Sequence, residues 1–418
     1  MPRISDEPQT VSPPCILFLV EDLSVPFNRR VWQEALTLRR TGFEVVVLCP
    51  QGHKHDREPF EVKEGVEIHR YPLTPSDGGM FGYAREYATA LWRMRRAIKK
   101  LARGRTFEIV HACNPPDLLF LAALSLKRAG ARFIFDQHDL VPELYLSRFG
   151  RGEDIFYRLA LWLERFMFRL ADVVISTNDS YRSIALSRGR KHPEDVFVVR
   201  NGPDLGRFRQ LEPDPSLKLA HPHLITYLGV MGPQDGIDHA LRSLALLREM
   251  RQDWHAIFVG DGDVGNAMRR LAVELGLGSM VEFTGMLVGD DVPRILSASD
   301  VCIAPDPKTS FNDVSTMNKI VEYMAMSRPI VAYDLVEARA SAGDAALYAE
   351  PNDERSFALR IAELLADPKL RARMGAEGRS RVETALSWAH SESSLLAAYD
   401  RALEREPIGS SVAERPVR

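Results

Sequence analysis

The chain has few cysteines and no long apolar run. Its 418 residues include only four cysteines, with no Cys-x-x-Cys pair among them: Cys15, Cys49, Cys113 and Cys302. This spacing argues against a zinc knuckle and a disulfide framework. No segment approaches the roughly 20 apolar residues that a membrane-spanning helix needs, and the first apolar run, Cys15–Val20, is too short for a secretory signal. We therefore expect a cytoplasmic location.

The sequence also lacks an excess of charge of either sign. Lys and Arg total 54 and Asp and Glu total 57, which gives a net charge of −3. A protein whose whole surface holds nucleic acid is therefore excluded. The composition is otherwise that of ordinary globular proteins, with 45% hydrophobic residues. The length fits two or three domains of about 150 residues each.

Short runs rich in Val, Ile and Phe alternate with longer segments of helical period, as in parallel sheets joined by crossover helices. In the first half these runs are Cys15–Val20, Glu44–Cys49, Val66–Tyr71, Phe107–His111, Arg132–Asp136, Asp172–Ser176 and Val196–Arg200. In the second half they are Leu224–Leu228, His255–Val259, Val281–Thr284, Val301–Ala304, Pro329–Tyr333 and Ala346–Ala349. The pattern predicts an α/β fold of two Rossmann-like, doubly wound parallel-sheet domains that face a cleft.

A polar, Pro-containing stretch, 210–223, separates the two series of runs and marks the domain boundary. We predict a first domain over residues 1–208 and a second over 209–386. A helical segment follows at 387–403. Residues 404–418 form a polar tail that we expect to be disordered.

In an open parallel sheet the ligand lies beyond the carboxyl ends of the strands, so the loops there are the candidate sites. A nicotinamide enzyme would need Gly-x-Gly-x-x-Gly after a strand. The loop after the first run, EDLSVPFNRR at 21–30, has no glycine, and GVMGPQDG at 229–236 has a different spacing. The sequence therefore argues against a nicotinamide cofactor.

The segment after Val301–Ala304 contains a predicted helix with two distinct faces. Several good N-cap residues, Asp313, Ser315 and Thr316, predict that the helix begins near Ser315. One face is apolar and follows the helical period: Met317, Ile320, Val321 and Met324. The opposite face is polar: Ser315, Asn318, Lys319 and Glu322.

The polar face of this helix suits a nucleotide diphosphate. Free N–H groups at the helix start and the charge of Lys319 favour an anion, and Glu322 can accept two hydrogen bonds from a ribose diol. The alternative is a solvated polar face with an Asn318–Glu322 pair.

Five separated stretches have the form and order of motifs in a known family. They are NGPDLGRF (201–208), FVGDGD (258–263), SASDVCIAPD (297–306), VEYMAMSRPIVA (321–332) and LSWAHSESSLLAAYDRAL (386–403). In these stretches the chain resembles the family 4 retaining glycosyltransferases of the GT-B fold. The pattern STMNKxxEYMA resembles a branch that acts in bacterial surface-polysaccharide assembly. By the same resemblance, the helix at 387–403 crosses back to pack on the first domain.

The resemblance implies transfer of a sugar from a nucleotide-diphosphate sugar, with uridine as the expected base, to a glycan or polyprenyl-linked acceptor in the cleft. It also implies retained anomeric configuration, with no metal and no cofactor. Two alternatives stay open, a non-catalytic nucleotide-sugar-binding subunit and an epimerase of the GT-B fold.

The resemblance also implies a donor site on the second domain. Glu322 matches the second acid of the family's Glu-x7-Glu motif, while Val314 stands at the position of the first acid and Asp313 is its candidate substitute. The family's Arg and Lys of the diphosphate loop are replaced by Val230 and Asp235. The expected donor-binding residues are Glu322, Lys319, Asn318, Thr316, Ser315, Asp313 and Gly232.

On the first domain, the resemblance places His138, after the run Arg132–Asp136, beside the donor sugar. We take it with its neighbour Asp139 as the catalytic pair, in which Asp139 would fix the tautomer of His138 or contact the acceptor. His111 is a weaker second candidate. The loop after the first run is expected on the acceptor side, through Asp22, Phe27 and Arg29. We assign no metal to the polar-loop histidines His53 and His55 or to the Asp-x-Asp sequence at 261–263, where a glycine turn is the simpler explanation.

A basic segment, Tyr83–Arg105, contains eight basic residues and one acid, with Trp92 among the basic side chains. Tyr87, Leu91, Met94, Ile98 and Leu101 form the stripe expected to pack on the sheet. Such a helix suits an anionic membrane surface, which would place the protein peripherally on the inner face of the plasma membrane. A solvated charged helix is the alternative.

Overall fold

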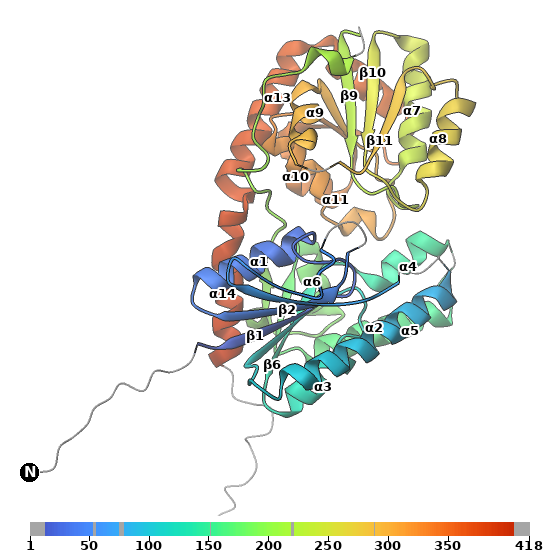
Figure 1. Cartoon of the computed structure of the whole chain (residues 1–418). Coiled ribbons are helices and arrows are strands. Elements are labelled where there is room, and N and C mark those ends of the chain that lie inside the picture. Colours follow the sequence, from blue (N-terminus) through green and yellow to red (C-terminus); the bar gives the residue numbers. More distant parts are fainter. Residues whose placement is uncertain are drawn as a thin grey trace, which may run out of the picture.

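The computed structural model describes residues 13–52, 56–74, 79–150, 152–218, 221–287 and 289–404. These residues form two α/β domains, with the C-terminal helix returning to the N-terminal domain (Figure 1). His53, His55 and residues 405–418 of the expected tail lie outside the described residues.

The N-terminal sheet has eight strands in the order β3-β4-β2-β1-β5-β6-β7-β8, in which β3 pairs antiparallel with β4 and the other neighbours pair in parallel. The strands are β1 (Cys15–Leu19), β2 (Glu44–Pro50), β3 (Phe60–Lys63), β4 (Val66–Tyr71), β5 (Ile109–Cys113), β6 (Arg132–Gln137), β7 (Val173–Ser176) and β8 (Val196–Val198). The helices are α1 (Arg29–Arg40), α2 (Met80–Leu101), α3 (Phe120–Arg128), α4 (Val141–Phe149), α5 (Ile155–Leu170) and α6 (Asp179–Ser187).

The second sheet has six parallel strands in the order β11-β10-β9-β12-β13-β14. They are β9 (His223–Leu228), β10 (Trp254–Val259), β11 (Val281–Gly285), β12 (Val301–Ala304), β13 (Ile330–Tyr333) and β14 (Ala346–Ala349). The helices are α7 (Ile237–Met250), α8 (Gly265–Glu274), α9 (Asp291–Ala298), α10 (Asn318–Ala325), α11 (Val336–Ala342), α12 (Glu354–Ala366), α13 (Pro368–Arg381) and α14 (Trp388–Glu404). Every predicted run overlaps a strand, and β3 is the strand that the sequence did not predict.

Alternate residues of each central strand enter different apolar cores, because successive side chains point to opposite faces of a sheet. Leu17 and Leu19 of β1 belong to the core covered by α2, α3 and α5. Ile16 and Phe18 belong to the core covered by α1 and α14. Burial on both faces explains why the strands are continuous apolar runs.

The C-terminal helix α14 joins the two domains (Figure 1). Trp388 Nε1 donates to Thr37 Oγ1 at 3.0 Å, and the Tyr399 hydroxyl lies 2.7 Å from Nδ1 of His111 in the N-terminal core.

The chain has crossed to the second domain before the predicted boundary at residue 209, because Phe208 is already buried in the second core.

Among the described residues, no helix has both the length and the apolar content to cross a bilayer.

Candidate active site

The carboxyl ends of the two sheets are joined by polar side chains. Asn178 Nδ2 at the start of α6 donates to the Val314 carbonyl and to Thr316 Oγ1, both at 2.9 Å. Asn201 Nδ2, after β8, donates to Asn318 Oδ1 at 3.1 Å. The predicted donor segment therefore faces the N-terminal domain directly.

Helix α10 begins at Asn318, so the prediction that it begins near Ser315 is wrong. The cap-forming side chains before it have other partners. Ser315 is buried, and its Oγ donates to the Phe311 carbonyl and contacts the Tyr181 hydroxyl of α6 at 2.9 Å. Ser315 therefore contacts the N-terminal domain through Tyr181, and its hydroxyl is engaged within the protein.

Asp313 does not take the place of the missing first acid. Its Oδ1 accepts from the Val336 N–H at the start of α11 and lies 3.4 Å from Lys308 Nζ. At the motif position itself, Val314 packs on the apolar cluster of Leu140, Tyr181 and Phe311 between the domains. An apolar interdomain contact therefore stands where the family's first acid would lie.

Lys319 is not on an open polar face. Its side chain is 7% exposed, and Nζ lies 2.6 Å from Asp306 Oδ1 and 3.9 Å from Asp235 Oδ1. The same nitrogen lies 5.1 Å from the ring centre of Tyr227. Lys319 therefore lies beneath the loop 229–236 and provides the positive charge of that loop from below.

Loop 229–236 follows β9 and depends on glycine where it approaches its neighbours. A Cβ at Gly236, whose φ is +68°, would lie 2.1 Å from the Pro305 carbonyl oxygen. The Gly232 N–H donates to Asp235 Oδ2 at 2.9 Å. Burial raises the pKa of Asp235 despite the opposing charge of Lys319, while Val230 is exposed.

Glu322 lies on the cleft side of α10. Its Oε1 accepts from Arg29 Nη1 at 2.9 Å, and its side chain is 15% exposed. Burial raises the pKa of Glu322, whereas Arg29, Arg207 and Lys319 oppose this rise. Arg29 was expected on the acceptor side. The structure instead places it against Glu322, the residue expected to bind the ribose, because α1 begins at Arg29 and points its side chain across the cleft.

His138 follows β6 and is held by buried charges. Its Nε2 forms a hydrogen bond with Asp136 Oδ2 and lies 3.1 Å from Arg30 Nε. Burial lowers the pKa of His138, but the charge of Asp136 and this hydrogen bond outweigh it, so the net shift is upward. The imidazole is therefore held in one orientation and favours its protonated form.

A chain of hydrogen bonds connects His138, through Asp136 and Arg30, to the first residue of α10. Arg30 Nη1 donates to Asn201 Oδ1 at 2.7 Å, and Asn201 in turn donates to Asn318. Consecutive arginines thus contact the two sides of the site, since Arg29 binds Glu322 and Arg30 binds Asp136, the partner of His138. A cavity of about 200 Å³ at this junction is lined by Arg29, Arg30, Asn201, Arg207, Asn318 and Glu322, among other residues.

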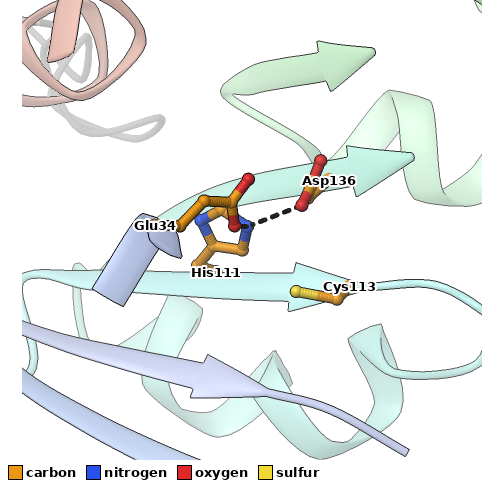
Figure 2. A group of neighbouring side chains, drawn as sticks. All are labelled: Glu34, His111, Cys113 and Asp136. Atoms are coloured by element: carbon orange, nitrogen blue, oxygen red, sulfur yellow. Dashed lines mark ion pairs between the residues drawn. The ribbon is translucent and has the colours of Figure 1, made fainter. Parts of the chain in front are cut away.

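Beneath His138 lies a buried cluster that the sequence did not predict. Figure 2 shows its side chains: Glu34, His111, Cys113 and Asp136. They are metal-ligand types, but Arg30 Nη2 lies 2.8 Å from Asp136 Oδ1 and 3.1 Å from Glu34 Oε1, so a guanidinium already supplies positive charge to both carboxylates. His111, the weaker candidate beside His138, is fully buried and is therefore a core residue that does not reach the cleft.

Asp139 and Asp22 bring two more carboxyl groups to the same end of the sheet. Burial raises the pKa of Asp139 to about 6, although the charge of His138 opposes the rise. Asp22 is exposed and accepts a weak hydrogen bond from Asn28 Nδ2 at 3.4 Å. Phe27 of the same loop is 40% exposed. These side chains leave the N-terminal wall of the cleft acidic and partly apolar.

Replacing Asp139 by asparagine should stabilise the fold at neutral pH. The pKa of Asp139 rises from 3.8 to about 6 on folding, so the wild-type chain loses stability as the pH rises from 3.8 to about 6. The variant lacks this ionisation and should gain on the order of 2 kcal/mol at pH 8 relative to the wild type. Thermal unfolding at a series of pH values measures the gain.

The exposed Asp400 provides the control for this prediction. Asp400→Asn should change the unfolding temperature little at any pH. A gain for Asp139→Asn that is equal at pH 4 and pH 8 would contradict the assigned ionisation.

Both domains match models of known protein families. Residues 222–367 match a model described as glycosyl transferases group 1. Residues 27–202 match a model described as a glycosyl transferase 4-like domain. The two matches follow one another along the chain and cover both sheets except strand β1.

Individual proteins show the same similarity. The chain is 24% identical over 358 residues to the putative glycosyltransferase EpsD of Bacillus subtilis, covering 82% of this chain and 85% of that one. Sucrose-phosphate synthase of Thermosynechococcus elongatus has a similar structure, with a TM-score of 0.76 and 19% identity over 93% of this chain and 98% of that one. Anabaena HepE in complex with UDP-glucose gives a TM-score of 0.68 and 17% identity over 92% and 99%. The predicted GT-B fold is confirmed.

Proposed function

The chain belongs to the group 1 glycosyltransferases, and its N-terminal domain is a glycosyl transferase 4-like domain; we propose that it is a retaining, metal-independent enzyme that uses a nucleotide-diphosphate sugar. The observation that carries the proposal is the connection between the two halves of the site. Arg29 binds Glu322 of α10, and Arg30 binds Asp136, which holds His138 after β6, so the residues expected to hold the ribose and the sugar face one cleft.

The donor nucleotide is proposed to lie against the second domain. Glu322 accepts from the ribose hydroxyl groups once Arg29 moves aside, and the diphosphate lies against loop 229–236 and the first N–H groups of α10. Lys319 supports that position with its charge from below. The HepE structure, which contains UDP-glucose in the same fold, supports a uridine donor.

The sugar and its leaving phosphate are proposed to lie next to His138. Asp136 occupies Nε2 of the imidazole, so Nδ1 is the nitrogen that donates to the sugar or to the phosphate. A protonated His138 would stabilise the charge that develops on the departing phosphate. The phosphate oxygen then takes the proton of the acceptor hydroxyl on the same face of the sugar, which retains the anomeric configuration.

The acceptor is proposed to be a glycan or a polyprenyl-linked sugar in surface-polysaccharide synthesis, with the enzyme in the cytoplasm. The sequence pattern STMNKxxEYMA supports this assignment. Phe27 and Asp22 offer an apolar and a polar contact on the N-terminal wall.

Incubation of the protein with a panel of nucleotide-sugars tests this function. Release of free nucleotide from one UDP-sugar, accelerated by a glycan or polyprenyl-phosphate acceptor, supports transfer. Binding of a UDP-sugar without turnover for any acceptor would favour a non-catalytic subunit. Release of free sugar and nucleotide that no acceptor accelerates would favour an epimerase.

Glu322→Gln should weaken UDP binding about tenfold, because a charge-assisted hydrogen bond to the ribose is lost. Calorimetric titration with UDP measures the change. The matched variant is Arg29→Gln, which removes the same ion pair but keeps the carboxylate. It should leave UDP affinity unchanged or higher. An equal loss in both variants would show that the ion pair, and not a ribose contact, matters.

A further inference from the structure

Helix α5 carries an exposed apolar stripe on its outer side. Ile155, Leu159 and Trp162 are 74%, 50% and 57% exposed. Their spacing of four and three residues places them on one face of the helix, and the stripe ends at Phe166, which is half-buried against Phe120 of α3. The opposite face of α5 is fixed in the N-terminal core by Met167 and Phe168. The stripe therefore points away from the domain.

Basic side chains border this stripe. Arg158, Arg165 and Arg169 are exposed and lie on one side of it, within about 80° of Ile155 at 100° per residue. Arg165 and Arg169 also line a cavity of about 600 Å³ that contains Arg188, Arg190 and Lys191. An apolar stripe bordered by arginines is typical of helices that lie in the headgroup region of a membrane.

Helix α2 repeats the same combination. Phe81 is 92% exposed and Trp92 is 56% exposed, and the two lie within about 20° of one another round the helix. Five exposed basic residues share this side, Arg85, Arg95, Arg96, Lys99 and Lys100. Arg96 lies over the Trp92 ring at 4.8 Å. Arg105, the last residue of the basic segment Tyr83–Arg105, does not belong to this group. It lies beyond the end of α2 and pairs with Glu44 and Glu67.

Both helices cover the same side of the N-terminal sheet (Figure 1). Met94 and Ile98 of α2 and Met167 and Phe168 of α5 enter one core, with α3 packed between the two helices. The exposed sides of α2 and α5 therefore point away from the same face of the sheet. Together they form one surface of aromatic and aliphatic side chains among arginines and lysines, which we call the α2/α5 surface.

We propose that the α2/α5 surface docks on an anionic lipid bilayer. Its cations attract anionic headgroups, and its Trp, Phe, Ile and Leu side chains enter the region of the acyl chains. A second copy of the chain is disfavoured as the partner, because a symmetric contact would bring the same basic residues together. The chain as a whole has a net charge of −3, so this attraction is local to the surface.

Sedimentation of the full chain with vesicles tests the proposal. The chain should bind vesicles of phosphatidylcholine with phosphatidylglycerol, and much more weakly vesicles of phosphatidylcholine alone. Neutralising Arg95, Arg96, Lys99 and Lys100 together to Gln should lower the partition coefficient about tenfold or more. The double variant Leu159→Ser, Trp162→Ser should lower it by a similar factor while leaving the preference for anionic lipid intact.

Matched controls on the second domain separate this surface from general charge or hydrophobicity. Arg270, Arg355, Lys369 and Arg373 are exposed basic residues to be changed together to Gln, and Val273 and Leu359 are exposed apolar residues to be changed to Ser. Both of these sets of substitutions should leave vesicle binding unchanged. Equal binding to both kinds of vesicle, or an equal loss in the control variants, would overturn the proposal. Failure of the wild type to bind phosphatidylglycerol vesicles would also overturn it and would leave the surface to a protein partner.

Discussion

Replacing Lys319 by methionine should weaken binding of UDP and of the donor sugar nucleotide about a hundredfold. Lys319 is the cation beneath loop 229–236, where Val230 and Asp235 stand at the positions of the family's Arg and Lys. Hydrogen bonds and ion contacts to a charged phosphate contribute about 1.5–3 kcal/mol each, so one lost cation in this sheltered position accounts for the expected change. Calorimetric titration with UDP gives the affinity.

The single variant also leaves Asp306 and Asp235 without their cation, which destabilises a buried site by about 3–5 kcal/mol. The double variant Lys319→Met, Asp306→Asn removes one of these carboxylate charges and should recover most of the thermal stability. If Lys319 serves the donor, the double variant folds but still binds UDP weakly. Recovery of UDP affinity together with stability would show that Lys319 only maintains the fold.

The position of Lys319 explains how the site tolerates Asp235. Burial raises the pKa of Asp235, so the charged form of this loop carboxyl is disfavoured. Lys319 on α10 lies 3.9 Å from this carboxylate and 2.6 Å from Asp306. In the proposed function, Lys319 therefore supplies from α10 the positive charge that the resembled family has on this loop.

The sequence predicted the sheets well because their strands are buried on both faces. The continuous apolar runs of β1 and β2 follow directly from that burial. Strand β3 was missed because it is a largely exposed edge strand of four residues with charged side chains. The sequence signal for it was Gly65, because the two-residue turn between β3 and β4 needs positive φ at both positions, and Glu64 and Gly65 have φ of 49° and 81°.

The candidate site was predicted in its location but not in its details. Helical periodicity assigned Lys319 to a face opposite Ile320, yet both are buried, because loop 229–236 covers the second side of α10. Cap propensity alone also misplaced the start of α10. Ser315 and Asp313 have partners in other parts of the chain, the Tyr181 hydroxyl and the α11 N–H, and such partners do not appear in local sequence.

The buried support of His138 shows the same limit. Arg30 and Glu34 lie one turn apart on α1 and look like an ordinary helical ion pair in the sequence. The fold brings them to Asp136, more than a hundred residues away, and thereby fixes the imidazole. Burial and the charge of Asp136 raise the pKa of Glu34, so its charged form is disfavoured in the cluster.

His138→Ala should lower kcat about a hundredfold with little change in the KM for the donor. The imidazole is proposed to act on the sugar and on the leaving phosphate, where charge develops in the transition state, and removal of one such donor costs about 10²–10³ in kcat. His138→Gln keeps a neutral hydrogen-bond donor and should restore part of the rate. Steady-state kinetics with the preferred donor separates kcat from KM.

The pH dependence of the rate distinguishes a protonated His138 from a neutral one. Burial lowers the pKa of His138, but the charge of Asp136 outweighs burial and the net shift is upward from the ordinary value of 6.5. The protonated form therefore persists to higher pH. The wild-type kcat should therefore fall as the pH rises past this raised value, and the His138→Gln profile should lack that fall. The exposed His192 supplies the control, because His192→Gln should retain the wild-type profile. A profile that is unchanged in His138→Gln would contradict the role of the imidazolium, and a kcat within threefold of wild type in His138→Ala would remove His138 from the reaction altogether.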